Sequence, residues 1–119
     1  MIFNLSKLKV SDNSGVKQVK CFKIFNQKTG SIGSIIYVSV KDIKSKSKLK
    51  KGDITKGIIV RSKKLVSRET GNYILFDFNE LVLLNEKHEL LATRIFGPLP
   101  LELRKKGHLK LLSLASTLI

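Results

Sequence analysis

The chain has 119 residues, about the size of one small domain, and 42% of them are hydrophobic. It carries 23 Lys and Arg against 9 Asp and Glu, a net charge of +14. This hydrophobic fraction excludes a disordered basic tail and indicates a packed domain with a positively charged surface. Residues 1–68 hold 17 basic and 3 acidic residues, whereas residues 69–119 hold 6 of each. The partner expected for the basic part is a polyanion, either nucleic acid or an anionic membrane surface.

Short β-strands separated by turns dominate the chain up to about residue 96. Apolar positions alternate with polar ones or form short β-branched runs, and clusters of Gly, Asn, Asp and Ser separate them. The predicted strands cover residues 8–10, 16–25, 35–40, 54–61, 73–76 and 81–84. The predicted turns and loops cover residues 11–15, 26–33, 41–53, 70–72 and 85–89. Many short strands without a long helical period predict a mainly β protein with a small closed barrel.

The pattern changes after Gly97-Pro98. Pro100 can open a short helix and Gly107 can cap its end, while residues 108–115 are compatible with a second short helix that docks on the barrel. We therefore expect one domain over residues 1–119, with a barrel over roughly 1–96 and a helical segment over roughly 97–119.

Patterns typical of catalysis or metal binding are missing from the sequence. There is no Gly-Lys dipeptide for a phosphate loop, and His88 and His108 lie at no metal-ligand spacing from another His or Cys. Cys21 is the one cysteine, which excludes an internal disulfide, and its apolar neighbours place it in the core. We expect no enzyme, no metal and no cofactor. We also find no targeting or membrane-spanning segment, and expect the protein to work in the compartment where it is made.

Two basic clusters are the strongest functional signal. Residues 41–51 contain six lysines interleaved with serines, a pattern suited to non-specific contact with phosphates, although most charge runs are only solvated loops. A second cluster follows the strand at 54–61, and two clusters that flank one barrel strand can lie close together. The predicted RNA-binding residues are Lys44, Lys46, Lys48, Lys50, Lys51, Arg61, Lys63, Lys64 and Arg68.

Aromatic residues suggest what kind of nucleic acid is bound. The chain has no Trp, two Tyr and six Phe, and most of these fall in apolar strands where we expect them to be core residues. Little aromatic surface would then remain for stacking single-stranded bases. Recognition of folded RNA through its backbone and shape fits better.

Several spaced motifs resemble the universal large-subunit ribosomal protein family L-fourteen, in one register along nearly the whole chain. They are Asp12-Asn13-Ser14-Gly15, Lys50-Lys51-Gly52-Asp53, Gly57-Ile58-Ile59-Val60-Arg61, Thr93-Arg94-Ile95-Phe96-Gly97-Pro98, Glu102-Leu103-Arg104 and Ser113-Leu114-Ala115. The family's longest diagnostic stretch begins at Gly57 and continues through Gly71, Phe76 and Asn79 to Val82-Leu83. The chain departs from the family pattern at a few positions. These changes leave the order and spacing of the family motifs intact, and they occur at Ser45, Ser47, Thr70, Ala92, Leu101 and Ser116.

The resemblance implies a five-stranded β-barrel with a β-ribbon and short C-terminal helices. It also implies binding to large-subunit rRNA, neighbours in ribosomal proteins L-nineteen and L-three, and bridges to small-subunit rRNA. Arg104, in its matching motif, joins the expected rRNA-binding residues. Ribosome-silencing factors dock on the subunit-facing surface of the family, and this surface corresponds here to Thr93, Arg94, Lys110 and Ser113.

We therefore predict a structural rRNA-binding protein of the large ribosomal subunit. One alternative is a free-standing barrel that binds single-stranded nucleic acid, as an RNA chaperone or initiation factor does; it requires exposed Phe or Tyr on one sheet face. A peripheral membrane protein is the other, but the chain lacks an amphipathic apolar anchor. The 19 Lys against 4 Arg indicate an AT-rich genome. This favours an organelle-encoded protein of the mitochondrial matrix, with a plastid or the bacterial cytoplasm as alternatives.

Overall fold

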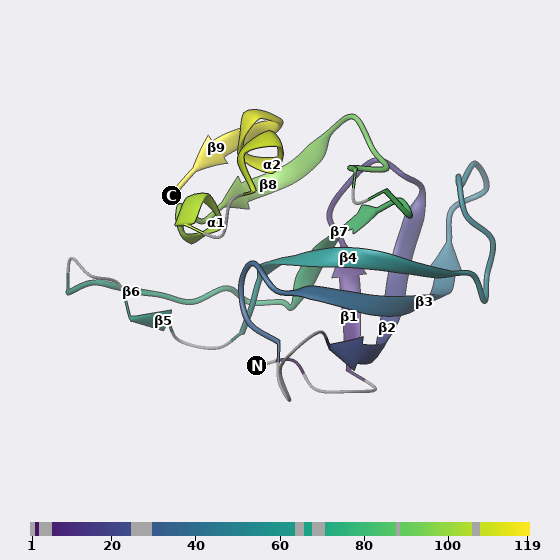
Figure 1. The fold of residues 1–119 in the computed structure, drawn as a ribbon, viewed down its shortest axis with the longest axis horizontal. Helices are drawn as coiled ribbons and strands as arrows, with labels where there is room; N and C mark the ends of the chain where they lie inside the picture. Colours follow the sequence, from purple (N-terminus) through teal and green to yellow (C-terminus); the bar gives the residue numbers. More distant parts are fainter. Residues whose placement is uncertain are drawn as a thin grey trace.

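Five strands form a closed barrel in the computed structural model, which describes residues 2, 6–24, 30–63, 66–67, 71–87, 89–105 and 108–119. The barrel strands, in spatial order, are β1 (Lys7–Val10), β2 (Val16–Ile24), β3 (Ile35–Ile43), β4 (Ile54–Arg61) and β7 (Glu80–Leu84) (Figure 1). Neighbouring strands are antiparallel except β1 and β7, which run parallel where the barrel closes. The prediction of a mainly β fold with a small closed barrel is confirmed.

A ribbon and a C-terminal segment complete the fold. The ribbon pairs β5 (Val66–Ser67) with β6 (Tyr73–Ile74) and extends from the left end of the barrel in Figure 1. The C-terminal segment contains, in chain order, β8 (Ile95–Leu99), α1 (Glu102–Lys105), α2 (Leu109–Ser113) and β9 (Ala115–Leu118). Both predicted helices are present, but strands β8 and β9, which pair in parallel, were not predicted. The pairing of β8 is irregular between Ile95 and Pro98, as expected where proline removes a backbone donor.

The barrel interior follows the alternation of apolar and polar residues along its strands. Val19 and Cys21 on β2, and Val38 and Val40 on β3, are at most 1% exposed and belong to one apolar cluster. The core position predicted for Cys21 is confirmed, and burial raises the pKa of its thiol above its ordinary value. This cluster makes the barrel a filled core rather than a channel.

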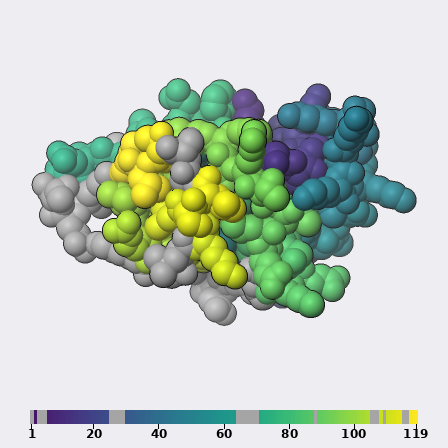
Figure 2. Space-filling model, turned by 90° about the horizontal axis from the view of Figure 1, so that it is seen from above, coloured from purple at the N-terminus to yellow at the C-terminus, as the bar shows by residue number. Residues whose placement is uncertain are grey.

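A second apolar cluster lies on the outside of the barrel, where the C-terminal segment covers β4 and β7. Val60 and Val82 point outward into it and meet Leu99, Leu103 and Leu111, all at most 1% exposed. Figure 2 shows the C-terminal segment, in yellow and green, over the middle of the molecule. Because both faces of β4 and β7 are buried, their sequences are continuously apolar over residues 57–60 and 81–84 instead of alternating.

Candidate nucleic-acid interface

The turn between β1 and β2 begins with a buried carboxylate. Asp12 is 4% exposed, and its Oδ1 accepts hydrogen bonds from the backbone N–H of Ser14 at 3.1 Å and from the Ser14 hydroxyl at 2.6 Å. Its Oδ2 accepts a third, at 3.1 Å, from the backbone N–H of Leu83 on β7. Three donors compensate the burial of the carboxylate, so Asp12 fixes the turn to the barrel wall.

The next residue of the turn positions part of the predicted protein-partner surface. Asn13 accepts through Oδ1 from the backbone N–H groups of Thr93 and Arg94, at 3.0 and 3.1 Å, and its amide donates to the Thr93 hydroxyl at 3.0 Å. Both Thr93 and Arg94 are exposed. The sequence predicts a turn at residues 11–15, but no local pattern in it indicates that the turn's side chains organise a segment 80 residues further along the chain.

The same turn also anchors the lysine loop, which we define as residues 44–53. The Lys44 N–H donates to the carbonyl of Gly15 at 2.7 Å, and the Lys48 N–H donates to that of Ser14 at 3.0 Å. Gly15 has φ +93°, and a Cβ there would lie 2.6 Å from the Cα of Ser47. Only glycine permits both this conformation and this close approach of two backbones.

Internal contacts fix the far end of the lysine loop. The Asp53 carboxylate accepts from the backbone N–H of Lys50 at 2.9 Å, and the Gly52 N–H donates to the Val40 carbonyl on β3 at 2.9 Å. Leu49 packs against the barrel core. The loop is therefore an ordered structure, and its exposed lysines are Lys44, Lys46, Lys48, Lys50 and Lys51. One of them is engaged internally, since the Lys48 ammonium donates to the Leu91 carbonyl at 2.9 Å.

The described part of the second predicted basic cluster lies at the far end of β4 from the lysine loop. Lys63 is exposed just beyond β4, whereas Lys64 and Arg68 lie outside the described residues. The loop precedes β4 and Lys63 follows it, so the two lie at opposite ends of an eight-residue strand that spans about 25 Å (Figure 1). Lys63 therefore does not lie beside the lysine loop, and the proximity of the two clusters stays a prediction for Lys64 and Arg68. Arg104 is exposed on α1, in the C-terminal segment.

Arg61 has an internal role. It is 7% exposed, forms an ion pair with Glu80 of β7, and donates through Nη1 and Nη2 to the carbonyls of Pro98 and Phe96 at 2.8 and 3.0 Å. A Cβ at Gly97 would lie 2.7 Å from Nη1, so glycine lets the guanidinium lie against β8. Arg61 therefore joins β4, β7 and β8, and we do not retain it among the candidate RNA contacts.

The other two residues of the predicted partner surface lie on α2. Lys110 and Ser113 are exposed and line an open depression of about 400 Å³ together with Glu89, Leu90 and Leu114. The side chains are thus of mixed character, with apolar leucines beside one cation and one carboxylate. A protein surface is a better chemical match for such a depression than a phosphate backbone.

Several aromatic side chains lie on the surface. Phe22 is 39% exposed and its ring stacks on that of Tyr37, with centroids 5.9 Å apart and planes inclined by 20°. Phe78 is 47% exposed, and the Lys9 ammonium lies 3.6 Å from its ring centroid. Tyr73 and Phe96 are also exposed. Four of the six aromatic residues that the structure describes are therefore exposed, and for these residues the expectation that most are core residues is wrong.

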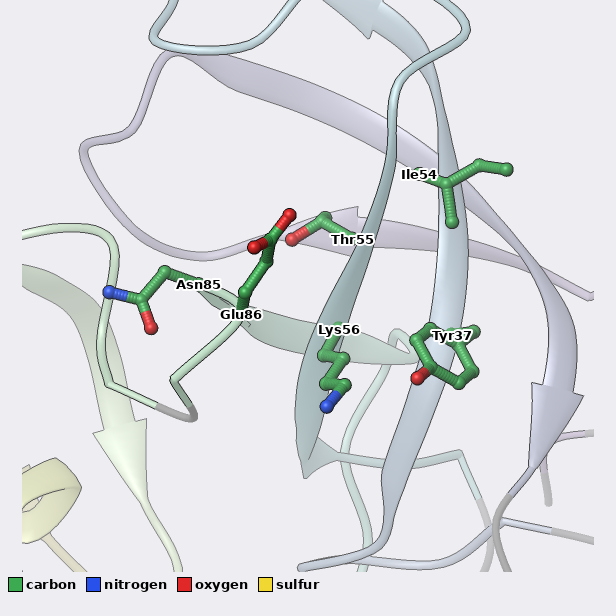
Figure 3. Close-up of a pocket in the computed structure, with 6 residues that line it drawn as sticks. All are labelled: Tyr37, Ile54, Thr55, Lys56, Asn85 and Glu86. Atoms are coloured by element: carbon green, nitrogen blue, oxygen red, sulfur yellow. The ribbon is translucent and has the colours of Figure 1, made fainter.

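A pocket of about 310 Å³ lies beside Tyr37, where β3 and β4 pass the turn that follows β7. Figure 3 shows its lining residues, which are Tyr37, Ile54, Thr55, Lys56, Asn85 and Glu86. The Lys56 ammonium is 5.6 Å from the centroid of the Tyr37 ring. An aromatic ring, an apolar side chain, a cation and a carboxylate therefore surround one hollow.

The histidines and acidic residues offer no catalytic arrangement in the part of the chain that the structure describes. His108 lies at the start of α2, where its Nε2 is 2.9 Å from the Gly33 carbonyl, and His88 is outside the described residues. Among the described residues there is no group of three or more His, Cys, Asp or Glu placed to bind a metal ion. Nor does any helix in them have the length and hydrophobicity needed to cross a membrane.

The comparison with known families agrees with the motifs that run through these features. The family model described as ribosomal protein L14p/L23e matches residues 1–119, the entire chain. The match includes the Asp12–Gly15 turn, the lysine loop, β4 with Arg61, and the segment that Asn13 positions. The chain is therefore a non-enzymatic protein of the large ribosomal subunit and belongs to the ribosomal protein L14p/L23e family.

Proposed function

We propose that this protein binds large-subunit rRNA through the lysine loop and helps to hold rRNA segments in a fixed arrangement. The anchored lysine loop is the observation that carries this proposal, because it presents exposed ammonium groups on a backbone fixed by hydrogen bonds at both ends. An ordered loop loses little conformational entropy when it binds. The proposed phosphate contacts are Lys44, Lys46, Lys50, Lys51, Lys63 and Arg104, with Lys64 and Arg68 added from the sequence.

The mechanism is electrostatic. Lysine ammonium groups act as point charges that neutralise phosphates without reading base sequence, which lets RNA helices approach one another closely. The Lys48 ammonium is bonded to the Leu91 carbonyl, so we assign Lys48 the task of orienting the loop. The protein provides geometry and charge, and no reaction is involved.

A second surface, formed by Thr93, Arg94, Lys110 and Ser113, is proposed to face protein partners at the subunit interface. Its support is the charge balance of residues 69–119 and the mixed depression next to α2. By analogy with the family, this surface would meet the small subunit across a bridge or a silencing factor. The family also implies proteins L-nineteen and L-three as neighbours of the chain. Ser113→Glu should leave incorporation into large subunits unchanged but weaken a partner contact; unchanged joining of subunits and unchanged silencing-factor binding would contradict this assignment.

The salt dependence of RNA binding tests the main proposal. The eight proposed phosphate contacts predict a slope of about −6 to −7 when log affinity is plotted against log salt. Replacing Lys46, Lys50 and Lys51 with Gln should reduce the steepness by about 2 to 3. The matched control replaces three exposed lysines outside the loop, Lys7, Lys17 and Lys87, and changes the net charge equally. A flat salt response, or equal loss in both triple variants, would refute the role of the loop.

The exposed aromatic residues support a second candidate function, that of a free-standing protein that binds single-stranded nucleic acid. That candidate requires aromatic residues on one sheet face, and Phe22 and Tyr37 occupy such a face. Sedimentation of the tagged protein distinguishes the two, since a structural ribosomal protein migrates with large subunits. A dominant ribosome-free pool would favour the free-standing protein.

We also propose that the protein is encoded and used in a mitochondrion. The support is compositional, since Lys outnumbers Arg 19 to 4 and Lys codons are rich in adenine. Finding the coding sequence in purified mitochondrial DNA would support the proposal, and finding it only in nuclear, plastid or bacterial DNA would refute it.

A further inference from the structure

We propose that the outer face of β2, β3 and β4 binds an unpaired nucleotide of RNA, with its base in the pocket between Tyr37 and Ile54. This inference extends the proposed RNA-binding function to a second site. It uses residues other than the lysine loop and a different kind of contact, base stacking. The two sites can therefore be tested separately.

The strand register places the required side chains on one face. Val38 of β3 is fully buried in the barrel, so its neighbours Tyr37 and Ser39 point outward. Pairing with β2 and β4 then gives two adjacent rows across the three strands. One row contains Lys23, Tyr37 and Lys56, and the next contains Lys20, Ser39 and Ile54. The face is therefore basic and partly aromatic, the composition used by proteins that bind single strands.

An irregularity in β2 adds a second ring to this face. The register between β2 and β3 shifts between Cys21 and Lys23, which places Phe22 outside the barrel, where it stacks on Tyr37. Such bulges redirect side chains and are common beside functional sites. The contact with Phe22 restricts the Tyr37 ring before any ligand arrives, so less entropy is lost when a base stacks on it.

The pocket beside Tyr37 suits a flat ligand with apolar faces and polar edges. Ile54 is 65% exposed, so it contributes little to the core and is available as an apolar wall. Lys56 supplies a cation for a phosphate, and Glu86 supplies acceptor oxygens on the rim (Figure 3). A carboxylate accepts from an exocyclic amino group, so we expect adenine or cytosine to bind better than uracil.

The surroundings favour RNA over a protein as the occupant. Lys20, Lys23 and Lys56 lie in the two rows, and Ile54 directly follows Asp53, the last residue of the lysine loop. The pocket is thus continuous with the proposed phosphate-binding surface, and an RNA strand that leaves the loop would reach it next. A purely apolar protein contact would not require this concentration of cations.

Fluorescence of 2-aminopurine tests the proposal. The probe is a 12-nucleotide single-stranded RNA with one 2-aminopurine among adenines, and a fully paired RNA hairpin serves as the comparison. Stacking on Tyr37 should quench the fluorescence. Tyr37→Leu should abolish this quenching and weaken binding of the single strand by roughly 5- to 150-fold, the range expected for one stacked base. Tyr37→Phe keeps the ring and should behave like the unmodified protein.

Ile54→Asp provides a variant that should fold normally, because Ile54 is largely exposed. It should also weaken binding of the single strand much more than that of the hairpin, for which the added carboxylate acts only through its charge. The Gln triple variant of the lysine loop should weaken binding of both RNAs but retain quenching at saturation. Loss of the loop contacts and loss of the stacking site therefore give different results. Quenching that survives Tyr37→Leu, or equal loss for hairpin and single strand, would overturn the proposal. It would also be overturned if Ile54→Asp spared RNA binding but disrupted contact with another ribosomal protein.

Discussion

Replacing Arg61 with methionine tests whether this arginine stabilises the fold or contacts RNA. The Arg61 side chain is 9% exposed, and that of its partner Glu80 is 18% exposed. The substitution leaves the Glu80 carboxylate without its cation and the carbonyls of Phe96 and Pro98 without their donor. Removing one member of a buried ion pair costs about 3–5 kcal/mol. Because Glu80 keeps some contact with water, we expect the lower end, about 3 kcal/mol.

Thermal and urea unfolding measure this loss. For a chain of this size, 1 kcal/mol corresponds to roughly 4 °C, so Arg61→Met should lower the Tm by about 12 °C. Arg61→Lys keeps the charge but cannot bond Glu80 and both carbonyls together, so we expect an intermediate loss. Lys63→Met is the control, since Lys63 is exposed and its replacement should change stability by less than about 0.5 kcal/mol.

A double variant isolates the contribution of the unpaired carboxylate. Adding Glu80→Leu to Arg61→Met removes that carboxylate, and part of the lost stability should return. The reasoning is refuted if Arg61→Met melts like the unmodified protein and instead weakens RNA binding. Arg61 would then be an RNA contact, as the sequence alone suggested.

Three further predictions concern Gly15, Asp12 and Cys21. Gly15→Ala should lower both stability and RNA affinity, because its Cβ would displace the lysine-loop backbone; Gly52→Ala, with φ +88° and open space around it, should cause only backbone strain of about 1 kcal/mol and no comparable loss of affinity. Asp12→Ala should destabilise the protein by about 2 kcal/mol or more in urea unfolding, because the buried N–H of Leu83 loses its acceptor; an unchanged midpoint would contradict this. The Cys21 thiol has a raised pKa and should react with a thiol reagent only after unfolding. Rapid labelling of the native protein would disprove the burial. Because the pKa of the thiol is higher in the folded than in the unfolded protein, the contribution of Cys21 to the free energy of unfolding should be complete below about pH 8.5 and decline at higher pH, where the unfolded thiol ionises.

Much of the barrel was predictable because its signals are local. Strands β3 and β4 have strong β-branched character, and glycine-containing turns separate the strands. Strands β8 and β9 escaped prediction because their pairing is parallel and joins residues separated by two helices. Gly97-Pro98 also argued against a strand at β8, since such a pair normally ends a strand. Its glycine is required by the approach of Arg61, which no local pattern could reveal.

The candidate site was predictable in its charges but not in its arrangement. The run of lysines is visible in the sequence, and the structure places these lysines, exposed, on the anchored loop. Whether a basic side chain is available to a ligand or is bonded within the protein depends on distant partners, as Arg61 and Lys48 show. The outward direction of Tyr37 could have been inferred, because it lies between Ile36 and Val38 in a strand whose alternate residues are buried.

Four consecutive residues determine how the two proposed surfaces are placed relative to each other. Asp12 attaches the β1–β2 turn to β7, and Asn13 attaches it to Thr93 and Arg94. The carbonyls of Ser14 and Gly15 accept hydrogen bonds from the lysine loop. A protein that contacts rRNA on one surface and a partner on another needs a constant geometry between the two. Because the turn is bonded to both, a substitution within it would alter both surfaces although none of these four residues is proposed to touch a ligand. The lysines provide affinity for a polyanion, and the turn determines where that polyanion lies relative to the other partner.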